Sequence, residues 1–205
     1  MPRWQQGEHV VIVGMSGSGK TTLARALLDR YRHWRVMLVT KPDDLTWRGW
    51  TRVRAHEAID PRRGPAWRLD PSYDEAPGHF RAFLDRAWSE GGWCVYADEL
   101  YHLQHAGLER DLVRVLTQGR SKRLTVVGGI QRPAWVTRFA LSEPRYTFCF
   151  RVGDRRDAKA LGDGLGKAFQ DEVETLGRYE FAFHDKVTGQ ISRGTSRDAE
   201  GVFEC

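Results

Sequence analysis

The feature that most constrains this chain is a glycine-rich octapeptide near its N-terminus. It matches the pattern G-x-x-x-x-G-K-[ST] and reads Gly14-Met15-Ser16-Gly17-Ser18-Gly19-Lys20-Thr21. A short β-branched run at residues 9–13 precedes it, and residues 21–31 repeat their apolar side chains with the period of an amphipathic helix. Such a strand, loop and helix present backbone N–H groups to an anion. The sequence therefore predicts a phosphate-binding loop, the Walker A motif.

Each residue type in this loop has a physical role. The glycines let successive N–H groups point at phosphate oxygens, the Lys20 ammonium reaches the terminal phosphates, and the Thr21 hydroxyl is expected to ligate Mg²⁺. We expect ATP and Mg²⁺ as cofactors. The predicted nucleotide-binding residues are Gly14, Ser16, Gly17, Ser18, Gly19, Lys20, Thr21 and Thr22.

The whole chain fits one α/β domain. Its 205 residues are enough to bury about 70% of the unfolded surface in a single core. Short apolar runs alternate with amphipathic stretches, which predicts a mostly parallel central sheet with helices on both faces. We expect a single P-loop NTPase domain over residues 1–205, with a loop and edge-strand insertion at 41–78 and a C-terminal β-hairpin at 179–193.

The apolar pattern also places the individual strands and helices. The expected strands of the parallel part are 9–13, 35–40, 93–97, 124–130 and 145–151. The expected helices are 21–31, 79–89, 108–118 and 156–176, with a short one after Pro133.

Composition excludes some classes and leaves others open. Cys94, Cys149 and Cys205 are odd in number and far apart, so neither a disulfide framework nor a zinc ribbon is expected, and a reducing compartment fits best. No apolar run approaches the ~18 residues of a membrane span. The formal net charge of +5 is a modest bias toward anionic partners and does not by itself indicate nucleic acid.

A carboxylate pair follows the apolar run at residues 93–97. Asp98 is expected to hold Mg²⁺ through water, and Glu99 to orient and deprotonate an attacking water. This pairing favours a hydrolase over a kinase, although a buried strand with an acidic end is the alternative. Glu99, His102 and His105 have spacing that could ligate a metal on one helical face, but a solvated or contact role is favoured because a second carboxylate cluster is missing.

Two further polar groups complete the predicted chemistry. Gln131 follows the strand at 124–130, which we expect between the Walker A strand and the acidic strand, where a neutral amide can contact both the attacking water and the γ-phosphate. Arg120, with Arg123 as second choice, is predicted to enter the site of a neighbouring subunit as an arginine finger. The alternatives are a glutamine satisfied within its loop and a solvated basic turn.

Together these motifs resemble the FtsK/HerA superfamily of DNA-pumping ATPases. The resemblance extends over nearly the whole chain and rests on the Walker A loop, Asp98-Glu99, Gly119-Arg120-Ser121, Gln131-Arg132-Pro133, the strand at 145–151, the closing hairpin and Thr40-Lys41-Pro42-Asp43-Asp44. Within the superfamily the chain is similar to the compact genome-packaging ATPases of tailless icosahedral viruses with an internal membrane. Ile130, where many relatives have threonine, and Gly128-Gly129 depart from the family pattern.

The resemblance implies an ATP-driven translocase that packages double-stranded DNA into a preformed capsid. It also implies a homo-oligomeric ring, commonly a hexamer, docked on a capsid vertex or a membrane-associated viral protein, and a location in the host cytoplasm or at the virion vertex. Residues 47–54 and 61–68, where arginines alternate with tryptophans, are candidate DNA-facing segments and equally typical of an interface or edge strand.

Three alternatives to genome packaging stay open at this point. They are a conjugation or filamentous-phage assembly ATPase of the same superfamily, a small-metabolite or nucleoside P-loop kinase, and a nucleotide-dependent assembly scaffold with little turnover.

Overall fold

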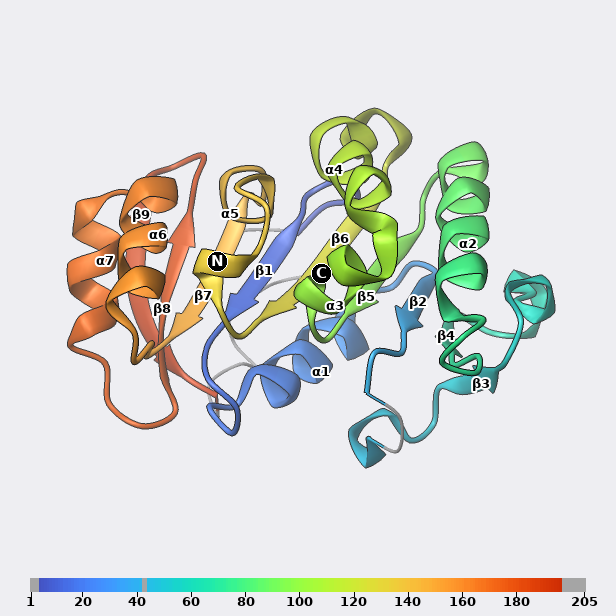
Figure 1. Cartoon of the computed structure of the whole chain (residues 1–205), viewed down its shortest axis with the longest axis horizontal. Coiled ribbons are helices and arrows are strands. Elements are labelled where there is room, and N and C mark those ends of the chain that lie inside the picture. Colours follow the sequence, from blue (N-terminus) through green and yellow to red (C-terminus); the bar gives the residue numbers. More distant parts are fainter. Residues whose placement is uncertain (1–3, 42–43, 197–205) are drawn as a thin grey trace.

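A computed structural model describes residues 4–41 and 44–196, which form an α/β domain around one sheet (Figure 1). Within the described residues the sheet has nine strands in the order β3-β4-β2-β5-β6-β1-β7-β8-β9. The strands are β1 (Val10–Val13), β2 (Arg35–Leu38), β3 (Thr51–Val53), β4 (Ala66–Leu69), β5 (Cys94–Ala97), β6 (Thr125–Ile130), β7 (Tyr146–Phe150), β8 (Glu180–Asp185) and β9 (Gln190–Thr195).

The strand directions position the functional residues. The strands β3, β4, β2, β5, β6, β1 and β7 are parallel to one another, whereas β8 is antiparallel to β7 and forms the C-terminal hairpin with β9. β6 lies between β1 and β5, as the sequence predicted. Because parallel strands end at the same edge of a sheet, the residues after β1, β5 and β6 come together there.

Helices cover both faces of the sheet, which confirms the predicted architecture. They are α1 (Lys20–Arg30), α2 (Ala76–Glu90), α3 (Leu100–Leu103), α4 (Glu109–Gln118), α5 (Phe139–Ser142), α6 (Arg155–Leu165) and α7 (Lys167–Glu174). Val10 and Ile12 of β1 pack with α1 in one apolar cluster, and Val11 and Val13 pack with α2 to α7 in the other. Figure 1 shows α1 on one side of the sheet and α2 to α5 on the other.

Two expectations about secondary structure are corrected. The predicted helix at 156–176 is two helices, because Gly166 between α6 and α7 adopts φ 96°, which an α-helix does not allow. The insertion at 41–78 was expected to add only edge strands, but β4 lies inside the sheet and pairs with both β3 and β2. Its residues Trp67 and Leu69 are therefore buried on the core side.

The structure also corrects the expectation that the tryptophans of the candidate DNA-facing segments could contact DNA. Trp47, Trp50 and Trp67 are 0%, 6% and 1% exposed, so their indoles belong to the core and are not available to stack on nucleic acid. Apolar burial explains this, since a tryptophan removes more surface from water than any other side chain. The arginines between them remain candidates.

A few further features bear on the expected class. No helix among the described residues is both long enough and apolar enough to span a bilayer. Cys94 and Cys149 are buried free thiols, and burial raises the pKa of each. Cys205, like Pro42 and Asp43 of the family-like segment, lies outside the described residues.

Candidate active site

The strand ends gather six of the eight predicted nucleotide residues, all except Gly14 and Ser18, around one cavity of about 250 Å³. The cavity lies at the carboxyl edge of the sheet, after β1, β2 and β6. Its lining residues are Ser16, Gly17, Gly19, Lys20, Thr21, Thr22, Lys41, Gln131 and Tyr179. The structure thus brings Gln131 to the Walker A loop, over a separation of more than a hundred residues.

The loop has the backbone conformation of an anion cradle. Gly17 and Gly19 adopt φ 73° and 109°, values that glycine takes at little cost. A Cβ on Gly14 would lie 2.8 Å from the Cβ of Phe150, so the loop also needs glycine for close packing. Within the described part of the chain, the buried Ser18 hydroxyl has no hydrogen-bond partner. An unpaired buried hydroxyl in a cradle of N–H groups fits a loop built to receive phosphate oxygens.

Lys20 is held against its own loop. Its Nζ donates hydrogen bonds to the carbonyl oxygens of Gly14 at 2.7 Å and Met15 at 2.9 Å. The side chain is buried, and burial, with a contribution from the nearby charge of Lys41, lowers its pKa to about 8. Among the described residues, the hydrogen-bond acceptors of this buried ammonium are these two carbonyl oxygens.

Asp98 is the most heavily hydrogen-bonded carboxylate of the site. Its Oδ1 accepts from Thr21 Oγ1 at 3.0 Å and from Tyr96 OH at 2.6 Å, and its Oδ2 accepts from Lys41 Nζ at 2.7 Å. Burial acts to raise the pKa of Asp98, but the donors from Lys41, Tyr96 and Thr21 outweigh it and hold that pKa below the usual value. The ionised carboxylate and the Thr21 hydroxyl are hard oxygen ligands side by side, which fits Mg²⁺.

Glu99 has a different environment from its neighbour. It is 4% exposed, and burial raises the pKa of its carboxyl, an effect that the backbone N–H of Gln131 opposes. That N–H donates to Glu99 Oε1 over 3.4 Å, a long hydrogen bond. When the pKa values of adjacent carboxyl groups are shifted in opposite directions, the two groups suit different roles. The group with the lowered pKa stays ionised, and the group with the raised pKa can accept and release a proton.

Two residues of the cavity were not predicted as site residues. Lys41 follows β2, and the signal that could have found it is a cation directly after a parallel strand, at the edge where ligands bind. No local pattern marks Tyr179. It lies at this edge because it directly precedes β8, which is antiparallel to β7 and begins beside the end of β7. Its φ of 64° is unusual for a non-glycine residue.

Arg120 and Arg123 do not join this cavity. Both are exposed and precede β6, so they lie at the edge where the parallel strands begin. A Cβ on Gly7, which precedes β1, would lie 3.1 Å from the Arg120 carbonyl oxygen, which places Arg120 at that edge. The length of the parallel strands therefore separates Arg120 and Arg123 from Lys20 of the same chain.

Arg132, beside Gln131, serves the architecture of the loop. It forms ion pairs with Asp154 at 2.9 Å and with Asp157 at 2.8 Å, and its guanidinium lies 4.5 Å from the ring centre of Trp135. These contacts tie the loop after β6 to the start of α6. Gln131 is therefore held between two fixed points, the end of strand β6 and the anchored Arg132.

The histidine run after Glu99 does not form a metal site. His105 packs edge-on against Tyr101, with ring centres 4.2 Å apart, and His102 is exposed. Among the described residues, Glu99, His102 and His105 are not gathered into a group that could hold an ion.

Comparison with known proteins identifies the family. Residues 2–127 match the family described as AAA ATPase domain. The chain belongs to this family. A relative, the "DNA packaging ATPase P9" of Enterobacteria phage PRD1, is 29% identical over 181 residues, covering 82% of this chain and 77% of the relative. The chain is thus an ATPase.

Solved structures agree on the fold of this ATPase. The "genome packaging NTPase B204" of Sulfolobus turreted icosahedral virus 2 superposes with a TM-score of 0.73 at 15% identity, covering 94% of this chain and 98% of that one. VirB4 of Thermoanaerobacter pseudethanolicus has a TM-score of 0.64 at 12% identity, covering 91% and 88%. At these identities the likeness shows a shared fold.

Proposed function

We propose that this ATPase couples ATP hydrolysis to the translocation of double-stranded DNA and packages a viral genome into a preformed capsid. The observation that carries the proposal is the similarity to the PRD1 packaging ATPase along most of both chains. The near-complete mutual coverage with B204 supports a compact packaging motor. We place the protein in the host cytoplasm, docked at a capsid vertex or on a membrane-associated viral protein.

In the proposed mechanism the Walker A residues hold the triphosphate. The backbone N–H groups from Gly14 to Thr22 surround its oxygens, and Lys20 leaves the carbonyls of Gly14 and Met15 to contact the terminal phosphates. Negative phosphates raise the pKa of Lys20 and keep it protonated. Thr21 and Asp98 would hold Mg²⁺, which would supply charge neutralisation at the phosphates.

Glu99 takes the proton of the attacking water. A carboxyl whose pKa is raised toward neutrality is a better proton acceptor than one held strongly acidic, so Glu99 suits this role and Asp98 does not. Gln131 orients the same water, and its backbone N–H keeps the Glu99 carboxylate in place. Lys41, paired with Asp98 at 2.7 Å and lining the cavity, adds positive charge beside the γ-phosphate.

Hydrolysis by a Glu99-activated water separates this proposal from a small-metabolite kinase. A kinase activates its own acceptor and has no need of a buried glutamate beside the Mg²⁺ ligand. The purified protein is therefore expected to release phosphate from ATP with Mg²⁺ in the absence of any small acceptor.

We propose that the active form is a homo-oligomeric ring, with a hexamer favoured. Among the described residues, the cations that line the cavity are Lys20 and Lys41. Arg120 and Arg123 are exposed at the opposite edge of the sheet, where another copy can be reached. An arginine entering the neighbour's site would neutralise charge that develops on the transferred phosphoryl group, an effect of about 10³ to 10⁵ in rate. Arg120 is the first candidate and Arg123 the second.

Mixing inactive variants tests the shared site. Arg120→Ala and Lys20→Ala subunits should each be inactive alone, and their mixture should regain part of the activity, because some sites then combine an intact Lys20 with a neighbour's intact Arg120. Arg123→Ala mixed in the same way is the matched comparison. Absence of rescue at every mixing ratio for both arginines would contradict the trans finger.

The exposed arginines of the insertion are the proposed DNA contacts. They are Arg48, Arg52, Arg54, Arg62 and Arg63. One of them, Arg52, is paired with Asp70 at 2.6 Å, and we expect DNA phosphate to compete for it. Six copies would carry a formal charge of about +30, so DNA binding should weaken steeply with salt.

DNA-stimulated hydrolysis tests the function as a whole. ATP turnover with Mg²⁺ should rise on addition of linear double-stranded DNA and should fall back as salt is increased. A soluble polyanion of equal charge, such as heparin, and the Lys20→Ala variant are the controls. Turnover indifferent to double-stranded DNA under all salt conditions would refute translocation while leaving the ATPase site intact.

A further inference from the structure

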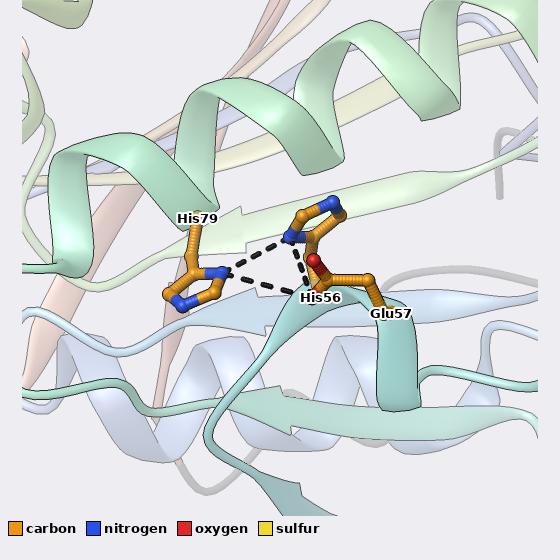
Figure 2. A group of neighbouring side chains, drawn as sticks. All are labelled: His56, Glu57 and His79. Carbon is orange, nitrogen blue, oxygen red and sulfur yellow. Dashed lines mark hydrogen bonds and ion pairs between the residues drawn. The ribbon is translucent and has the colours of Figure 1, made fainter.

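A second group of ligand-type side chains lies far from the nucleotide cavity. His56 and Glu57 belong to a short 3₁₀ helix, η2 (His56–Ala58), between β3 and β4, and His79 lies near the start of α2. β3 and β4 are at the opposite end of the sheet from β7 to β9, with β2, β5 and β6 between β4 and β1. Figure 2 shows the three side chains converging from these two helices. None of the three lines the nucleotide cavity.

The three ligand atoms are spaced as around one metal ion. His56 Nδ1 lies 3.0 Å from His79 Nδ1 and 3.0 Å from Glu57 Oε2, and His79 Nδ1 lies 3.9 Å from Glu57 Oε2. In a triangle with these sides, the point equidistant from the corners is about 2.0 Å from each. That length matches the roughly 2.0–2.2 Å bonds of zinc to histidine nitrogen and carboxylate oxygen.

Hydrogen bonds among these three side chains cannot pair all three ligand atoms at once. A neutral histidine with its proton on Nδ1 can direct that proton to the other Nδ1 or to the carboxylate, but not to both. Two protonated Nδ1 atoms 3.0 Å apart would oppose each other. A divalent cation accepts all three lone pairs at once, so it is the one occupant that pairs every atom of the group.

A hydrogen bond links η2 to α2 beside the group, and one side of the group is open to solvent. Ile59, next to η2, is 2% exposed and its carbonyl oxygen accepts a hydrogen bond from Arg86 Nη1 of α2 at 2.8 Å, which fixes η2 against that helix. The side chains of His56 and His79 are 22% and 24% exposed, whereas that of Glu57 is 67% exposed. Solvent therefore reaches the group from the Glu57 side, which supplies an entry path and a water as fourth ligand.

We propose that His56, Glu57 and His79 bind one divalent transition-metal ion, of which zinc is the expected physiological one. Two imidazoles and a carboxylate favour zinc, cobalt or nickel over magnesium and calcium, which prefer all-oxygen sites. The ligands span 23 residues, and the ion would fasten the segment between β3 and β4 to α2. The metal thereby holds the arginine-bearing insertion in place on the domain.

A cobalt titration tests the site directly. Tag-free full-length protein, freed of metal by a chelator, should bind one Co²⁺ per chain with visible absorption different from that of hydrated Co²⁺, and Zn²⁺ should displace it. The His56→Ala and His79→Ala variants should lose this absorption. Glu57→Gln, at an exposed position where folding is not at risk, should weaken Co²⁺ binding about tenfold or more. Zn²⁺ should raise the melting temperature of the wild type but not that of the His56→Ala or His79→Ala variant.

Matched controls separate this site from chance binding and from the nucleotide site. The His102→Ala/His105→Ala double variant removes two exposed histidines of the same chain and should titrate like the wild type. Lys20→Ala should also bind Co²⁺ normally, so failure of the metal site and failure of the ATPase site are distinguishable. A wild type whose Co²⁺ absorption equals that of hydrated Co²⁺, or equals that of the His56→Ala/His79→Ala double variant, would overturn the proposal.

Discussion

Replacing Glu99 by glutamine should separate catalysis from folding and from nucleotide binding. The substitution keeps the shape of the side chain and removes only its charge. The single hydrogen bond described for the carboxylate is the long one from the Gln131 N–H at 3.4 Å, and the glutamine amide oxygen can accept it equally. Little packing is therefore lost at a position that is 4% exposed.

Glu99→Gln should lower turnover without lowering stability. Because burial raises the pKa of Glu99, its folded-state charge is unfavourable at pH 7, so Glu99→Gln should leave the free energy of unfolding unchanged or increase it. Turnover should fall by about 10²–10⁴-fold, since a positioned general base contributes that much. This corresponds to about 3–5 kcal/mol of activation free energy.

Three measurements on one preparation test this prediction. Phosphate release gives the turnover number, titration with a fluorescent ATP analogue gives nucleotide affinity, and urea unfolding at pH 7 gives stability. Glu109→Gln makes the same chemical change at an exposed position in the first turn of α4 and should alter none of the three by much. A Glu99→Gln variant with turnover within a few-fold of the wild type would remove Glu99 from the mechanism.

Two more predictions concern the sheet. Burial lowers the pKa of His9 to about 4, so between about pH 6.5 and pH 4 mainly the unfolded chain takes up this proton, and the wild type should lose up to about 3 kcal/mol of stability as pH falls through that window. His9→Gln should lose less in urea unfolding across the same range, and equal losses would contradict this reasoning. Gly129→Ala would set a Cβ 2.0 Å from the Asp98 carbonyl oxygen, so β6 must shift from β5; we expect a loss of about 1–3 kcal/mol and of ATP turnover. Gly78→Ala in α2, where a Cβ meets nothing within 4 Å, is its control and should be neutral or stabilising in the same unfolding assay.

The parts of the fold that sequence reasoning predicted are those set by neighbouring residues. The Walker A loop is a run of eight residues whose glycine spacing permits the required φ values, and the helix that follows has its own apolar period. The strand ends carrying Asp98 and Gln131 could be predicted for a related reason. Buried parallel strands are continuous apolar runs, and their carboxyl ends share one edge.

Sequence patterns missed what depends on the pairing of distant segments. The short apolar run of β4 between prolines predicts an edge strand, because it carries no information about the strands beside it. The cluster of His56, Glu57 and His79 was missed because its two parts come from different helices with no motif spacing between them. The placement of Tyr179 depends on the antiparallel direction of β8, which the residues before the hairpin do not specify.

At the active site, some features follow from the local sequence and others only from the tertiary structure, and the difference has a physical reason. The amino-acid sequence alone determined the phosphate loop and the identity of the two carboxylates, because these depend on backbone geometry and chemistry within a few residues. Only the tertiary structure decided that Thr21 and Lys41 contact Asp98 across 77 and 57 residues. It also decided that hydrogen-bond donors outweigh burial and lower the pKa of Asp98, whereas burial raises the pKa of Glu99. Hydrogen-bond partners and loss of solvent are properties of the packed sheet, and no local pattern in the chain encodes them.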